Sequence, residues 1–179
     1  LAKCKKGITR QELITQSGIT SGGDFSLKLT ELTVSGFVSE YTYYKNKNKL
    51  SLYRLSDEYS LFYLKFIQLN EGNGTGTWQK KKKKQSYLSW SGFSFETLWL
   101  KHATQIKKAL GIDAIYATNS SWFNSNAQID LLIDRDDNII NLCEIKFYNS
   151  TFTIDKKYYL NLKNKIEEFQ QESATRKNI

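Results

Sequence analysis

Residues 128–133 read Gln-Ile-Asp-Leu-Leu-Ile, and a little further along the chain residues 144–146 read Glu-Ile-Lys. Both segments have the apolar, β-branched character of buried strands. Residues two apart in a strand share a face, so Glu144 and Lys146 should point the same way while Ile145 points into the core. Charges on an otherwise apolar strand are costly to bury unless they bind something, so this pattern indicates a binding site.

A turn joins the two predicted strands. Residues 134–138 read Asp-Arg-Asp-Asp-Asn, which favours a hairpin turn, and the second strand is expected over residues 139–147. The hairpin brings Asp130 close to Glu144 and Lys146, and Gln128 shares the face of Asp130. The alternative is an ordinary hairpin with a solvated Glu–Lys pair, which contributes little.

Composition places the chain among globular proteins. At 179 residues with 40% hydrophobic content, it can form one or two small packed domains. No apolar run approaches the ~20 residues of a membrane span and no signal peptide is visible, so we expect no membrane partner and a cytoplasmic location. The two cysteines, Cys4 and Cys143, fit a reduced protein, and ligand supply excludes a zinc site. We expect a structural role for His102, the only histidine.

Charge is unevenly distributed. The whole net charge of +8 falls within residues 1–90, and residues 91–179 carry equal numbers of acidic and basic side chains. Methionine and proline are both absent. Average usage predicts about nine prolines in this length, and an AT-rich coding genome would lower that number. It would not remove methionine, so we expect either that the sequence does not begin at its native N-terminus or that residues are missing from it.

Residues 1–69 have the pattern of a winged helix-turn-helix domain. A capping box at Thr9 and Glu12 begins a first helix, a second is expected from about Gly22 to Gly36, and two strands over residues 37–41 and 51–55 enclose a basic tip. In such folds the second helix and the wing contact DNA. The candidate DNA contacts are Lys28, Lys45, Lys47, Lys49 and Arg54. Packing or protein interaction is an equal alternative, because the second helix offers no arginine to read bases.

Residues 70–91 are predicted to be a linker. They combine a turn-rich stretch with a lysine run at residues 80–84, flanked by Trp78, Tyr87 and Trp90. Aromatic residues among lysines can stack on single-stranded bases, but they more often anchor a linker on its neighbouring domain. No phosphate-binding loop occurs in the sequence.

Residues 92–179 follow the order helix, strand, strand, strand, helix. A long apolar helix is expected over residues 93–111 and a first strand within residues 112–119. The two strands of the charged hairpin follow, and the last helix is expected to run from Asp155 to about Gln171. The predicted fold class is therefore α+β.

The Asp130, Glu144-Ile145-Lys146 pattern resembles the PD-(D/E)xK nuclease superfamily, which has the restriction-endonuclease-like fold. The whole chain resembles the C-terminal portion of a family of prokaryotic AAA-like ATPases, in which a winged helix and a PD-(D/E)xK domain follow the ATPase domain. That likeness rests on residues 51–63, 91–96 and 127–135. It implies an upstream ATPase domain as a partner, and one further strand after Ile179.

The resemblance also implies a mechanism. Asp130 and Glu144, with the backbone carbonyl of Ile145, would hold Mg²⁺ or Mn²⁺, and Lys146 would act on the attacking water or the developing charge. Glu96 would complete a second metal site, or else lie at the surface. Gln128 would touch the phosphate or a metal-bound water.

Two functions remain open. The first is a Mg²⁺-dependent DNA endonuclease domain of a larger ATP-binding protein. The alternative is a catalytically inactive DNA- or protein-binding module attached to the ATPase, which the neutral charge of residues 91–179 favours.

Overall fold

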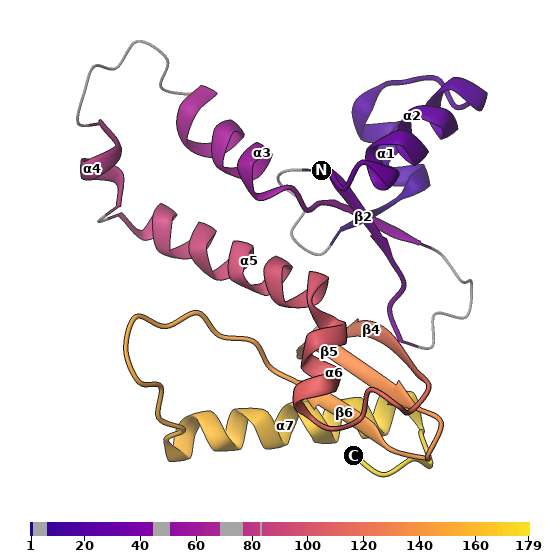
Figure 1. The fold of residues 1–179 in the computed structure, drawn as a ribbon, viewed down its shortest axis with the longest axis vertical. Helices are drawn as coiled ribbons and strands as arrows, with labels where there is room; N and C mark the ends of the chain where they lie inside the picture. The colour runs from indigo at the N-terminus through magenta and orange to yellow at the C-terminus, as the bar shows by residue number, and fades with distance from the viewer. Residues whose placement is uncertain (2–6, 45–50, 69–76, 83) are drawn as a thin grey trace. The chain divides into compact units, whose positions relative to one another are not determined.

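The computed structural model describes residues 1, 7–44, 51–68, 77–82 and 84–179. Within them the chain forms an α+β structure with two three-stranded antiparallel sheets (Figure 1). It divides into two compact units. Unit 1 comprises Leu1–Thr42 and Asn48–Ser94, and unit 2 comprises Tyr43–Lys47 and Phe95–Ile179. No helix in the described part of the chain is both long and apolar enough to cross a membrane.

Unit 1 begins with a short strand, β1 (Ile8–Thr9), and two helices, α1 (Arg10–Ser17) and α2 (Gly23–Val34). The predicted capping box is confirmed, because Thr9 Oγ1 accepts from the Glu12 amide at 3.2 Å and Glu12 Oε2 accepts from the Thr9 amide at 2.7 Å. Gly18 ends α1 with a φ of 67°, a conformation that glycine adopts without strain. The strand β1 was not predicted, since two residues are too few to show alternation.

The sheet of unit 1 has the order β1-β3-β2, with β2 at Val38–Tyr41 and β3 at Leu52–Leu55. Phe25 and Leu29 of α2 pack with Val38 as its core. Leu32, three residues after Leu29 on the same helix, is 43% exposed. The sheet is followed by α3 (Glu58–Phe62), which continues as a π-helical turn, η1 (Tyr63–Ile67).

Part of the stretch predicted as a linker is helical. It contains α4 (Thr77–Lys81) and the first turns of α5 (Gln85–Lys101). The Trp90 ring packs 5.4 Å from Phe62 and 5.7 Å from Phe66 between centroids, so this aromatic residue serves packing within unit 1. The side chain of Trp78 lies outside the described residues.

The single helix predicted over residues 93–111 is wrong in both extent and continuity. It is two helices, α5 and α6 (Ala103–Ala109), separated at His102, whose φ of −103° and ψ of 25° leave the helical region. The sequence pattern does not reveal this break, because the helical spacing of apolar residues continues where the chain resumes helical geometry directly afterwards.

The sheet of unit 2 has the order β4-β5-β6, with β4 at Ala117–Phe123, β5 at Gln128–Arg135 and β6 at Ile140–Cys143. The first strand was predicted too early. The Ile115 amide donates to the Ile112 carbonyl at 3.2 Å, so the chain turns there, and the strand begins at Ala117. Ile112 is nevertheless buried, because the turn itself packs on the sheet.

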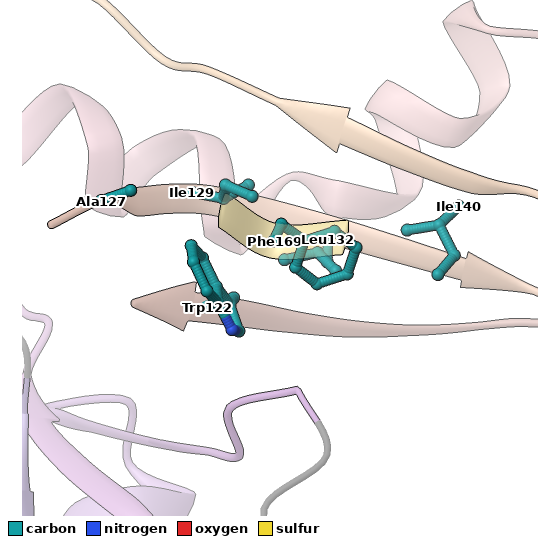
Figure 2. Close-up of a cluster of buried hydrophobic side chains, with 6 residues drawn as sticks. All are labelled: Trp122, Ala127, Ile129, Leu132, Ile140 and Phe169. Carbon is teal, nitrogen blue, oxygen red and sulfur yellow. The ribbon is translucent and has the colours of Figure 1, made fainter. Parts of the chain in front are cut away.

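Helices cover both faces of this sheet. On one face Phe169 of α7 (Lys156–Ser173) packs against Trp122, Ile129, Leu132 and Ile140 (Figure 2). On the other face, Leu131 and Ile133 pack with Ile112, with Leu100 from the end of α5 and with Ile106 from the middle of α6. This double coverage explains why β5 reads as a continuous apolar run and not as an alternation.

After α7 the chain returns to the sheet. The Ile140 amide donates to the Asn178 carbonyl at 2.8 Å, and Asn178 forms a parallel bridge with Ile139. Lys177 Nζ contacts Asp134 Oδ1 at 2.6 Å. These contacts set Asn178 beside the start of β6, and the strand expected after Ile179 stays a prediction.

Candidate functional site

The β5–β6 hairpin brings the predicted acidic residues together. Leu131 pairs with Cys143 and Leu132 with Leu142, so continuing the antiparallel register by one residue sets Asp130 opposite Glu144. Asn138 in the turn has a φ of 68°, which asparagine tolerates better than most residues. The turn chemistry read from residues 134–138 is thus confirmed.

The second strand of the hairpin is shorter than predicted. It ends at Cys143, so the Glu144-Ile145-Lys146 segment lies just beyond the ladder. The Ile145 amide donates to Asp130 Oδ2 at 2.9 Å. Because it is bonded to this side chain, it does not continue the backbone hydrogen bonding between β5 and β6. Glu144 and Lys146 still point the same way, because their side chains form an ion pair, while Ile145 packs against the core.

Asp130 lies at an irregularity of the sheet. Ser120 of β4 pairs with Leu132, but Trp122 pairs with Ile129, so two residues of β5, Asp130 and Leu131, lie opposite one residue of β4. Such a bulge changes the direction of local side chains and is frequent next to functional sites.

The carboxylate of Asp130 is buried, with the residue 7% exposed. Besides the Ile145 amide, it accepts a hydrogen bond from Gln128 Nε2 to Oδ1 at 3.2 Å. Burial raises the pKa of Asp130, the Ile145 hydrogen bond lowers it, and the charge of Glu144 raises it further, with a net rise. The predicted proximity of Gln128 and Asp130 is therefore present, with Gln128 acting on the carboxylate.

Glu144 is held by two ammonium groups. Lys146 Nζ lies 2.7 Å from Oε1 and Lys165 Nζ lies 2.7 Å from Oε2. The Tyr158 hydroxyl also donates to Oε1 at 3.4 Å. Burial raises the pKa of Glu144, but the hydrogen bonds from Lys146 and Lys165 outweigh it and leave the pKa below its usual value.

Lys165 and Tyr158 were not among the site residues predicted from the sequence. Both belong to α7, and they are seven residues apart, which puts them on one face of the helix two turns from each other. Asp155 fixes the start of this helix, since its side chain accepts from the Tyr158 amide at 2.7 Å. The sequence does contain an indication of this contact, because the seven-residue spacing puts Tyr158 and Lys165 on the same face of the helix as the buried Phe169.

The carboxylates of Asp130 and Glu144 are the hard oxygen ligands that Mg²⁺ and Mn²⁺ take. Burial is the main cause of the raised pKa of Asp130, and the charge of Glu144 adds to it; a divalent cation would relieve both. Binding through Glu144 would compete with its ion pair to Lys165. Glu96 is half-buried on α5. It does not join them in a group of three, since no metal-binding cluster of three or more His, Cys, Asp or Glu residues occurs in the described part of the chain.

The DNA contacts predicted within residues 1–69 differ in their surroundings. Lys28 is exposed on α2 and pairs with Asp24 at 2.9 Å. Arg54 is only 5% exposed and stacks 5.1 Å from the Tyr41 ring, so its burial argues against the predicted contact with a phosphate. Lys45, Lys47 and Lys49 lie outside the described residues.

The remaining polar candidates fit structural roles. His102 is exposed at the break between α5 and α6, and its structural role stays a prediction. Cys143 is a free thiol, and burial raises its pKa, which makes it a poor nucleophile. Cys4 lies outside the described residues.

Comparison of the chain with family models, with curated proteins and with solved structures finds no match.

Proposed function

We propose that unit 2 is a divalent-cation-dependent phosphodiesterase that cleaves DNA. The observation that carries the proposal is the arrangement of Asp130, Ile145 and Glu144, in which a buried carboxylate is fixed by a backbone amide directly beside a second carboxylate. Mg²⁺ or Mn²⁺ would be held by these two carboxylates and the Ile145 carbonyl. When bound, the cation supplies Lewis acidity for the phosphate and lowers the pKa of its water.

Lys146 supplies positive charge at the open side of the site. Its side chain is 47% exposed and lies 2.7 Å from Glu144. Burial lowers the pKa of Lys146, but the hydrogen bond to Glu144 raises it more, with a net rise. Its ammonium therefore stays protonated near neutral pH, and its role is to attract the phosphate and stabilise developing negative charge, not to accept a proton.

Gln128 positions the site. Its amide donates to one oxygen of Asp130 while the Ile145 amide donates to the other, so the carboxylate is held from both sides. Holding a ligand in one orientation before the cation arrives is the usual task of such outer hydrogen bonds.

The alternative function is a DNA- or protein-binding module without catalysis, attached to an ATPase. Two observations favour it: both oxygens of Glu144 are ion-paired with lysines, and the described residues contain no three-member metal-binding cluster. In that role Lys165 would permanently neutralise Glu144.

A cleavage assay tests the proposal. A mixture of labelled single-stranded and duplex DNA is incubated with the protein in Mg²⁺, in Mn²⁺ and in EDTA. Cleavage should require the cation and fall at least about 100-fold in Asp130→Asn and Lys146→Met, as for loss of a transition-state contact. Asp113→Asn, the same substitution at an exposed turn residue, is the matched control. Cleavage that persists in Asp130→Asn would refute the proposal.

A further inference from the structure

Aromatic side chains gather beside the charged site of unit 2. The loop between β6 and α7, which Figure 1 shows as a long excursion before the helix, carries Tyr148 and Phe152, and Tyr158 follows in the first turn of α7. Tyr148 is 61% exposed and Phe152 is 40% exposed. A contiguous patch of exposed aromatic rings indicates an interaction site.

The rings form a continuous row that begins at the site. Tyr158 donates its hydroxyl to Glu144 at 3.4 Å, and its ring lies 5.0 Å from that of Phe152 between centroids. The Phe152 ring lies 5.3 Å from that of Tyr148. The row thus leads from the carboxylates to the most exposed ring, and mutual ring contacts hold its members in place before any ligand arrives.

Basic side chains accompany the row. Lys146 lies at the site itself, and Lys156 and Lys157 are exposed at the start of α7. The acidic residue among them, Asp155, has its carboxylate engaged with the Tyr158 amide. Aromatic rings alternating with lysines are the composition of surfaces that bind single-stranded nucleic acid, with bases stacked on rings and phosphates near ammonium groups.

We propose that Tyr148 and Phe152 stack on unpaired bases and thereby make single-stranded DNA the form of substrate that the site accepts. The inference rests on the proposed function, because the DNA strand is placed by the phosphodiesterase site at one end of the row. Duplex DNA is disfavoured, since its base faces are already covered by neighbouring bases.

Binding measured without a divalent cation tests the inference separately from catalysis. Fluorescence anisotropy in EDTA compares a labelled single-stranded oligonucleotide with its duplex. The wild type should prefer the single strand, and Tyr148→Ala and Phe152→Ala should each weaken that binding about 5- to 150-fold, the loss of one stacked base. Tyr148→Phe and Phe152→Tyr keep a ring and should retain binding. Tyr116→Ala, at a ring 71% exposed elsewhere in the unit, is the control.

Equal affinity for single strand and duplex, or unchanged binding in both alanine variants, would overturn the inference. Far-ultraviolet circular dichroism establishes that each variant is folded. Ring-dependent binding of the single strand without any Mn²⁺-dependent cleavage would sustain stacking and defeat the proposed activity. Cleavage of duplex DNA at the same rate in the wild type and in both alanine variants would support the proposed activity and overturn the stacking of bases on the rings.

Discussion

Replacing Lys165 by methionine probes the contact that the sequence did not reveal. Methionine keeps the length of the apolar stem but removes the ammonium that lies 2.7 Å from Glu144 Oε2. The side chains of Lys165 and Glu144 are only 17% and 15% exposed, so water replaces the lost partner poorly. The variant should therefore be less stable than the wild type.

The expected loss lies between two limits. Removing one partner of a fully buried ion pair costs about 3–5 kcal/mol, and an exposed pair contributes about 0.2–1 kcal/mol. Glu144 here keeps Lys146 and the Tyr158 hydroxyl as partners. The free energy of unfolding should therefore fall by about 2 kcal/mol, the contribution of one charge-assisted hydrogen bond.

Hydrogen exchange of the β5 amides measures this loss within unit 2. If these amides exchange by unfolding of the unit, about 2 kcal/mol corresponds to exchange roughly 30 times faster. Lys163→Met, an exposed lysine on the same helix, is the matched control and should leave the rates unchanged. A double-mutant cycle with Glu144→Gln should show about 1–2 kcal/mol of coupling. Additive effects, or equal rates in the Lys165 and Lys163 variants, would refute the assigned contact.

Further predictions concern charge and the turns. Glu144 has a lowered pKa, so its ionisation stabilises the fold at pH values above about 4.3, the pKa of a glutamate in the unfolded chain. Glu144→Gln should therefore be less stable than the wild type by about 1–2 kcal/mol at pH 7. In acid titrations of unfolding, this difference in stability should disappear as the pH falls below about 4. Asp130 has a raised pKa, so its ionisation destabilises the fold, and the wild type should gain stability relative to Asp130→Asn as the pH falls and Asp130 takes up a proton. A stability difference that stays the same between neutral and acid pH in unfolding titrations would contradict this. Asn124→Ala removes side-chain bonds to the Ala127 amide at 2.7 Å and to Glu168 at 2.9 Å, and should cost about 1–3 kcal/mol in urea unfolding, with Ser125→Ala as control. Thr9→Ala removes the cap of α1 and should cost about 1 kcal/mol, whereas Thr9→Ser should cost little.

The sequence was most informative where local chemistry decides the structure. The capping box at Thr9 and the turn at residues 134–138 depend on residues close together in the chain, and both were predicted correctly. The proximity of Asp130 and Glu144 followed from the hairpin alone. Each inference needed only the strand period and the preferences of turn residues.

Features that depend on tertiary contacts were missed. The strand β6 ends at Cys143 because a side chain of β5 takes the Ile145 amide, which no property of residues 139–147 indicates. Lys165 reaches Glu144 only because α7 packs on the sheet through Phe169. The bulge at Asp130 likewise depends on how β4 pairs, and β4 itself begins later than its apolar pattern suggested.

Isothermal titration with Mn²⁺ tests the central claim most directly, that Asp130 and Glu144 form a cation site. The wild type should bind the ion, Asp130→Asn should not, and Asp113→Asn should bind as the wild type does. Lys165→Met, which frees an oxygen of Glu144 from its ion pair, should bind about tenfold more tightly, a change of about 1.4 kcal/mol. Absence of binding to the wild type, or equal binding to Asp130→Asn, would contradict the account and favour a binding module that carries no metal.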